Sequence, residues 1–293
     1  MVAIARGGGG MRGYLITNAF MRGGSFEKMR KLFMEAAQKQ GVELLSRTNA
    51  DFMRGIPAGE CDFALFYDKD VRLAQQLEAQ GLRVFNSADA IAVCDDKTLT
   101  YLSLRAAGIP QPESLLCPMT FPGVDYGDMH FVEEAADVLG LPMVIKEGCG
   151  SFGQQVYLAQ DAAQAKAIIA RIGAKPALFQ RYVKECAGHD ERLFVVNGQV
   201  IAAIRRESRN GDFRANIENG GYPVAYEPTK EECALAVRAC QALKLDFAGV
   251  DLLPGASGPL VCEVNSNAHF AGLMQITGVN PADHIISYIR RTL

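Results

Sequence analysis

The stretch 247–265 constrains the fold of this chain more than any other. Two short apolar runs, 247–253 and 260–265, flank the segment 254–259, which reads PGASGP. Strand-forming residues on both sides of a Gly/Pro turn are typical of a β-hairpin. We therefore expect two antiparallel strands here. The polar residues within these apolar runs, Asp251, Glu263 and Asn265, are then candidates for a functional role.

The polar residues of this hairpin are predicted to share one face. Side chains alternate along a strand, which places Glu263 and Asn265 with Val261 and turns Cys262 away, while Asp251 of the partner strand can face the same side. Two carboxylates this close repel each other unless a cation lies between them, and oxygen ligands suit magnesium. The hairpin thus predicts a divalent-metal site. The alternative is a hairpin whose polar residues only face water.

Composition and charge narrow the class of protein. The 293 residues are 49% hydrophobic and 22% charged, which is ordinary for a globular protein of about two domains. A net charge of -3 argues against general affinity for nucleic acid or anionic membranes, and no apolar run approaches the ~20 residues of a membrane-spanning helix. Eight cysteines lie scattered without a CxxC pair, which favours free thiols and a cytoplasmic location.

Strands and helices alternate over the first part of the chain. Residues 1–10 include four consecutive glycines and are expected to form a flexible leader. The elements expected between 11 and 90 are strands at 14–17, 42–45, 63–67 and 82–85, a helix capped by Ser25 and ending at Gly41, and a helix at 71–80. This alternation predicts a small parallel α/β domain.

The pattern changes after residue 91. The elements expected up to 180 are helices at 95–107, 130–139 and 161–172, and strands at 143–146 and 177–180. Farther on, we expect a hairpin over 192–206 that turns at Asn197-Gly198, a capping box at 229–232 before a helix, the hairpin described above, and a helix at 281–290.

A glycine-rich loop follows a strand that ends in Lys146. Its phosphate-binding candidates are Gly148, Gly150, Ser151 and Gly153. Backbone N–H groups of such a loop can approach phosphates without obstruction by side chains. The loop joins two strands and matches neither a Walker A loop nor a Rossmann turn, so it is either a flap over a nucleotide or an ordinary hairpin loop. Lys146 could neutralise a phosphate, and Lys97 at the start of a helix repeats this pattern.

Two more segments are candidates for nucleotide contacts. The connecting segment that leaves a strand comprises Gln180, Arg181, Tyr182 and Val183. Its backbone can contact adenine, and Asp190 farther on can hold ribose hydroxyls, unless the segment is a plain connector. A basic cluster comprises Arg205, Arg206, Arg209 and Arg214, with Asn216 nearby. It is either solvated surface or a stabiliser of an acyl phosphate. No histidine shows a triad or metal spacing, so no nucleophile is expected.

Five segments together resemble a known family. In chain order they read DDKTLT, PMVIKEGCGSFGQQV, FQRYVKECAGHDERLFVV, GDFRANIENGG and VDLLPGASGPLVCEVNSN. They resemble the ATP-grasp fold, and most closely its RimK-type glutamate ligase branch, over about residues 90–293. The resemblance implies an α/β and α+β architecture: a small parallel α/β domain over 11–90, ATP-grasp lobe A over 91–180 with the glycine-rich flap, and lobe B over 181–293 with the metal hairpin.

The resemblance also implies roles for residues. It implies that two magnesium or manganese ions are held by Asp251, Glu263 and Asn265. It implies ATP contacts from Lys97, Lys146, Arg181, Tyr182, Asp190, Arg214, Ala215 and Asn216. The chain departs from many relatives at Arg181, where they carry an acid, and at 267–269, where they often have small residues or proline. The second departure faces the substrate side and leaves the acceptor open.

The predicted function is an ATP-dependent carboxylate–amine ligase. A carboxylate would attack the γ-phosphoryl group, and an amine would then attack the acyl phosphate, with Arg205 steadying the developing charge. The expected acceptor is an amino acid, a peptide or a carrier protein, with glutamate one candidate for the group added; nucleic acid and membrane are not expected partners, and self-association stays open. The alternative is a catalytically silent ATP-binding regulatory or scaffold protein. A nicotinamide enzyme is disfavoured because no GxGxxG turn follows 14–17.

Overall fold

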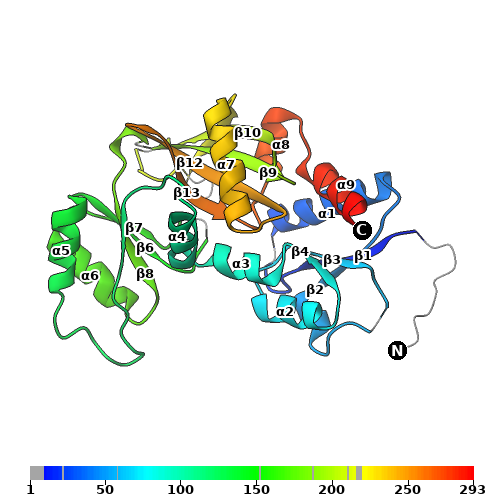
Figure 1. Ribbon diagram of the computed structural model, residues 1–293, viewed down its shortest axis with the longest axis horizontal. Coiled ribbons are helices and arrows are strands. Elements are labelled where there is room, and N and C mark those ends of the chain that lie inside the picture. The colour runs from blue at the N-terminus through cyan, green and yellow to red at the C-terminus, as the bar shows by residue number, and fades with distance from the viewer. Residues whose placement is uncertain are drawn as a thin grey trace.

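The computed structural model describes residues 10–21, 23–57, 59–151, 153–186, 188–209, 211–215 and 220–293. Their strands form three sheets that lie along the longest axis of the molecule (Figure 1). Within these ranges no helix is both long and apolar enough to cross a membrane. Apart from residue 10, the predicted leader 1–10 lies outside the described residues.

The N-terminal sheet is parallel, as predicted, in the order β2-β1-β3-β4. Its elements are β1 (Arg12–Thr17), α1 (Gly24–Lys39), β2 (Glu43–Thr48), the 3-10 helix η1 (Asn49–Phe52), β3 (Phe63–Phe66), α2 (Val71–Ala79) and β4 (Arg83–Phe85). The predicted cap of α1 is wrong, because Gly23 precedes the helix without a side-chain cap and Ser25 lies inside the first turn.

A second, four-stranded sheet is antiparallel, in the order β5-β8-β6-β7. Its elements are β5 (Ser114–Leu116), α5 (His130–Leu139), β6 (Met143–Glu147), β7 (Val156–Ala159), α6 (Ala162–Ile172) and β8 (Ala177–Arg181). Helices α5 and α6 pack on this sheet around one buried core that includes Val132, Ile169 and Phe179. We call residues 114–181 the small lobe.

The third sheet has five strands in the order β11-β10-β9-β12-β13. Its elements are the 3-10 helix η2 (Lys184–Cys186), β9 (His189–Val196), β10 (Gln199–Glu207), β11 (Tyr222–Ala225), α7 (Lys230–Ala242), β12 (Phe247–Gly255), β13 (Gly258–Asn265), α8 (Ala271–Thr277) and α9 (Pro281–Thr292). Two local predictions are confirmed: Asn197 and Gly198 form the β9–β10 turn with positive φ, and Thr229 caps α7 in a capping box.

The five-stranded sheet packs against two different cores. On one face, Phe194 and Phe247 share a core with Leu15, Phe33 and Phe63 of the N-terminal part, together with α8 and α9. The other face packs against α7 and contacts α3 (Ala88–Asp95) and α4 (Lys97–Ala106). Helices α1 and α9 therefore lie between the two sheets (Figure 1). The N-terminal sheet and the five-stranded sheet form one packed body.

Besides the 3-10 helices η1 and η2, four elements were not predicted: α3, β5, β11 and α8. Helix α3 is short, and only Asp96 separates it from α4. Its helical periodicity was therefore not recognised in the sequence as a separate element. The predicted boundary at residue 90 lies within α3. The division into 11–90, 91–180 and 181–293 itself stays a prediction.

Candidate active site

The predicted hairpin is present, but its strands are joined by a β-bulge. Asp251 of β12 lies opposite Glu263 of β13, whereas Leu252 pairs with Val261, so Cys262 is the extra residue. Val261 and Leu252 belong to the buried core on the α7 face. The prediction that Val261 shares the face of Glu263 is wrong, because a bulge breaks the alternation on which that prediction rested.

Asp251 lies in a buried network of ion pairs. Its two oxygens accept hydrogen bonds from Arg192, both at 2.7 Å, and one of them accepts another from Arg206 at 2.9 Å. Arg206 also donates two 2.6 Å bonds to Asp190. Burial disfavours the charged form of Asp251, yet the charges of Arg192 and Arg206 outweigh it and hold the pKa of this carboxyl below its usual range. Asp251 is therefore an ionised carboxylate that is already compensated by two guanidinium groups.

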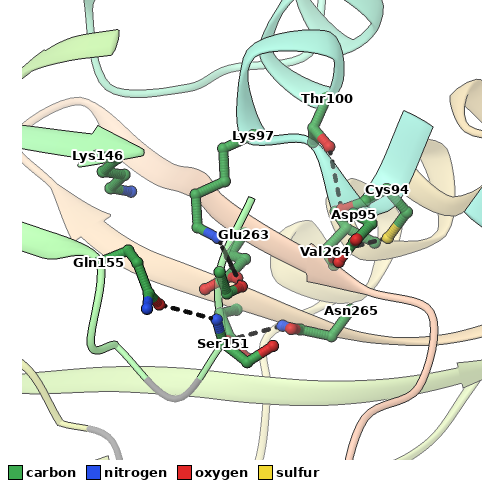
Figure 2. A network of polar contacts seen from close by, with 12 residues as sticks. Cys94, Asp95, Lys97, Thr100, Lys146, Ser151, Gln155, Glu263, Val264 and Asn265 are labelled. Carbon is green, nitrogen blue, oxygen red and sulfur yellow. Dashed lines mark hydrogen bonds and ion pairs between the residues drawn. The ribbon is translucent and has the colours of Figure 1, made fainter. Parts of the chain in front are cut away.

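Glu263 faces Lys97 at the start of α4 (Figure 2). Lys97 Nζ lies 3.4 Å from Glu263 Oε1 and donates to the Gly150 carbonyl at 3.1 Å. Asn265 Nδ2 lies 3.4 Å from Asp251 Oδ2. Burial opposes ionisation of Glu263, but the charges of Lys97 and other cations lower the pKa of this carboxyl. The structure thus brings all three predicted metal ligands to one end of the hairpin.

Lys146 approaches the same hairpin from the small lobe. It is 6% exposed, and its Nζ donates to Cys262 Sγ over 3.5 Å. The bulge is what turns Cys262 toward this lysine. Lys146 and Lys97 thus present their ammonium groups near Glu263 from two separate elements (Figure 2). Their predicted role in neutralising phosphate stays a prediction.

The glycine-rich loop begins in contact with α4. The Lys97 backbone N–H donates to the Gly148 carbonyl at 2.8 Å. A Cβ on Gly148 would lie 2.8 Å from Asp96 Oδ1, and a Cβ on Gly150 would lie 2.4 Å from Gln155 Oε1. Side chains therefore do not fit at these two positions without rearrangement, because the loop lies close against its neighbours.

Farther along, cationic side chains from two distant segments hold the loop. Lys69, which follows β3, donates to Ser151 Oγ at 3.1 Å, and Arg214 donates to the Gly153 carbonyl at 2.9 Å. Each cation is also paired with a carboxylate, Lys69 with Asp95 and Arg214 with Asp212, so a phosphate would replace only the neutral oxygens of the loop. The arrangement supports the flap interpretation for Gly148–Gly153, which stays a prediction.

The connecting segment after β8 is mostly structural in its side chains. Arg181 pairs with Glu113 and donates to the last carbonyls of α5, at Val138 and Leu139. Gln180 is buried and donates to Ser114 Oγ at 3.0 Å. The Arg181 backbone N–H is also bonded, because it donates to the Glu113 carbonyl at 2.8 Å, so Tyr182 and Val183 are the members of this segment left for an adenine. Of the other predicted members of the nucleotide set, Tyr182 packs edge-on against Phe213, which lies two residues before Ala215 in the sequence.

The predicted catalytic arginine is not brought to this site. In the β9–β10 pairing, Arg206 lies opposite Asp190 and Arg205 lies opposite Glu191, so the two arginines face opposite sides of the sheet. Arg205 donates to Glu191 at 3.0 Å and lies over the ring of Tyr226, on the α7 side. The role given to Arg205 is therefore corrected, because strand alternation points it away from Glu263.

The rest of the basic cluster is also dispersed. Arg209 stacks on Tyr222, whereas Arg214 contacts the glycine-rich loop. Asp190, predicted to hold ribose hydroxyls, is paired with Arg206. Asn216 lies outside the described residues. Sequence reasoning missed Arg192 and Lys69. Arg192 was detectable, because it opens a predicted strand two residues after Asp190, and residues two apart along a strand share a face.

A cavity of about 830 Å³ opens beside these residues. It is lined by the carboxyl ends of the parallel strands, including Thr17, Thr48 and Asp68, and it extends to Glu263 and Asn265. The order β2-β1-β3-β4 changes winding direction between β1 and β3, and ligands of open parallel sheets bind at such switch points. The cavity is therefore a candidate substrate site between the N-terminal sheet and the hairpin.

Solved structures share this architecture. A RimK domain ATP-grasp protein from Sphaerobacter thermophilus superposes with a TM-score of 0.73 at 24% identity, covering 94% of this chain and 98% of that one. A D-alanine–D-alanine ligase from Bacillus anthracis gives 0.71 at 19% identity, covering 96% and 97%. These likenesses define the fold as ATP-grasp, and the predicted mixture of a parallel N-terminal sheet and antiparallel sheets is confirmed.

Comparison of sequences identifies the family within this fold. Residues 94–289 match the RimK-like ATP-grasp domain. A probable alpha-L-glutamate ligase 2 of Shewanella denitrificans is 37% identical over 223 residues, which are 75% of this chain and 71% of that protein. The chain belongs to the RimK-like ATP-grasp family. It is an ATP-dependent ligase that forms amide bonds, as the sequence predicted, and enzymes of this kind use ATP with a divalent metal.

Proposed function

We propose that this ligase joins an amino acid, with glutamate the first candidate, to a carboxylate that is activated as an acyl phosphate. The carrying observation is that Glu263, Asn265 and Lys97 converge at one end of the cavity, beside Gly150 and Ser151 of the glycine-rich loop. Phosphates held by this loop would meet a carboxylate held in the cavity. Names of relatives that specify glutamate support the choice of amino acid.

The donor set of the hairpin suits a hard divalent cation. Glu263 and Asn265 line the cavity, and their oxygens, with those of Asp251, are the ligands that magnesium or manganese prefers. Among the described residues there is no group of three His, Cys, Asp or Glu side chains placed for a metal, so the amide of Asn265 is needed in the set. Asp251 would contribute by exchanging a contact with Arg192 or Arg206. Two such ions would neutralise the β- and γ-phosphates.

Other residues of the chain would bind the phosphates and adenine of ATP and stabilise the acyl phosphate. Lys97 and Lys146 would neutralise phosphate oxygens, and backbone N–H groups of Gly148–Gly153 would position them. Backbone groups of 182–183 would hold adenine between the small lobe and the five-stranded sheet. Arg192 lines the cavity and replaces Arg205 as the candidate for steadying charge on the acyl phosphate. The eight cysteines are free thiols, which supports a cytoplasmic location.

Phosphorus NMR during turnover tests the reaction. We expect ADP and inorganic phosphate, because the cationic groups gather where the terminal phosphates would lie. Hydroxylamine supplied in place of the amine should trap the carboxylate as a hydroxamate. AMP and pyrophosphate as products would show that the α-phosphate is attacked and would overturn the acyl-phosphate mechanism.

A further inference from the structure

A buried carboxylate lies at the switch point of the N-terminal sheet. Asp68 lies two residues after the end of β3, lines the cavity and is 6% exposed. Asn18, which follows β1, donates to its two oxygens at 3.1 and 3.3 Å, and the backbone N–H of Lys69 donates at 2.7 Å. Asn18 is itself fixed, because its Oδ1 accepts the backbone N–H of Phe20. The carboxylate is thus held in one orientation before any substrate binds.

Asp68 has no cationic partner within the described ranges. The adjacent Lys69 is turned to Asp95 and Ser151 instead. Burial raises the pKa of the Asp68 carboxyl, and the charges of Asp70 and Asp95 add to this effect. A buried carboxylate without a counter-ion is costly, and neutral hydrogen bonds compensate it only in part. The site therefore favours a ligand that brings a positive charge.

A second acceptor lines the same cavity. The Oδ1 atom of Asn267 is buried and has no hydrogen-bond partner among the residues that the structure describes. The hydroxyl of Tyr67 donates to the Ala268 carbonyl at 2.5 Å, which ties the segment after β3 to the segment after β13. Asp68 and Asn267 are the immediate neighbours of these two bonded residues. An unpaired buried carbonyl oxygen calls for a donor, because leaving it unsatisfied costs free energy.

We propose that Asp68 and Asn267 form a subsite for the primary ammonium group of an amino-acid substrate. A carboxylate and a carboxamide oxygen match the donors of an ammonium group, which has no acceptor of its own. Asn267 lies two residues beyond Asn265, so the bound nitrogen would be near the predicted phosphate site. This inference rests on the proposed function, and it gives the departure of residues 267–269 from many relatives a role in substrate choice.

The ammonium group has two sources. It belongs either to the amine acceptor, which would lose a proton before it attacks the acyl phosphate, or to the α-amino group of an amino acid whose carboxylate is activated. Both sources present the same chemistry to Asp68 and Asn267. They differ in whether the reaction with hydroxylamine, a neutral acceptor, depends on the subsite.

Equilibrium binding tests the subsite directly. Calorimetry with MgADP present would compare each L-amino acid with its des-amino acid, beginning with L-glutamate and glutarate. We expect the wild-type chain to bind at least one amino acid roughly 10- to 100-fold more tightly than its des-amino analogue. Asp68→Asn should abolish that preference, and Asn267→Ala should reduce it. Asp70→Asn is the matched control, because Asp70 caps α2 and does not line the cavity.

The outcomes separate the subsite from the proposed function. Absence of any preference in the wild-type chain, or a preference that survives in Asp68→Asn, overturns the subsite. Products of ATP turnover judge the ligase chemistry independently of this binding measurement. In the hydroxylamine reaction, a raised KM for the amino acid in Asp68→Asn assigns the ammonium group to the activated substrate. Unchanged hydroxamate formation, together with the lost binding preference, assigns it to the acceptor.

Discussion

The small lobe and the five-stranded sheet face each other across the predicted nucleotide site, but they are built differently. The small lobe closes its own core between its sheet and helices α5 and α6. One face of the five-stranded sheet shares a core with the N-terminal sheet, and its other face forms a second core with α7, α3 and α4. The small lobe can therefore change position without exposing a core, whereas the other two sheets must move together.

This difference assigns separate tasks to the two regions. Apart from Gly150 and Ser151 of the small lobe, the described lining of the cavity belongs to the packed body of the N-terminal and five-stranded sheets, so most of its shape is fixed by a shared core. The predicted nucleotide-binding groups are split, with Lys146 and the glycine-rich loop in the small lobe and Glu263 across from them. Relative movement of the small lobe would thus open and close the nucleotide site while the substrate cavity is preserved.

The largest expected effect is on the rate of ADP release, and it should distinguish a carboxylate of the hairpin, Glu263, from one in the small lobe, Glu147. Glu263→Gln should lower ADP release by roughly 100-fold or more, because it removes the charged ligand that would hold the divalent cation neutralising the phosphates. Glu147→Gln in the small lobe is the matched control, since Glu147 is paired with Lys175 and Tyr157. Its rate should stay within about tenfold of wild type. Equal losses in the two variants at saturating MgATP would contradict the role of the hairpin.

Truncating one buried ring in the small lobe and one in the shared core should show whether each region unfolds as a separate unit. Phe179→Ala and Phe247→Ala each remove a fully buried ring, and each should cost about 3–5 kcal/mol. Hydrogen exchange should show lost protection confined to 114–181 for Phe179→Ala. For Phe247→Ala the loss should extend over the N-terminal and five-stranded sheets together, because this ring belongs to the shared core. Equally wide effects from both variants would show that the small lobe is not an independent unit.

Breaking an ion pair should cost much more stability in the five-stranded sheet than in the small lobe. Arg206→Met would leave Asp190 without its guanidinium partner in a buried site, and we expect a loss of about 3–5 kcal/mol. Lys166→Met breaks the exposed pair with Glu133 in the small lobe and should cost under about 1 kcal/mol. Urea unfolding measures both. A small effect of Arg206→Met would mean that Arg192 alone compensates Asp251.

The smallest expected effect is local ordering of the glycine-rich loop. MgATP should slow amide exchange over residues 147–154, because phosphate would replace the neutral oxygens now bound by Lys97 and Arg214. Exchange in β9 and β12 should change little, since these strands lie in the packed body. Unchanged exchange at 147–154 under saturating nucleotide would count decisively against a flap.

Much of the local structure was predictable because its signals are short-range. The turn at Asn197-Gly198 and the capping box of α7 depend on residues adjacent in sequence, and both are present. Glu263, Asn265, Lys97 and the glycine-rich loop were also identifiable, since each lies at the end of a strand or the start of a helix. Arg205 was assigned wrongly because a run of two arginines in a strand sends one side chain to each face, and sequence does not say which face matters.

The sequence by itself determined the alternation of strands and helices, the hairpin at 247–265 and the family of the chain. Only the tertiary structure decided that a bulge at Cys262 sends Val261 to the core, that Arg192 and Arg206 compensate Asp251, and that Asp68 and Asn267 line one cavity. The reason is physical. Side-chain periodicity is set by each strand's own backbone, whereas register and contacts between residues some 200 positions apart depend on how whole elements pack.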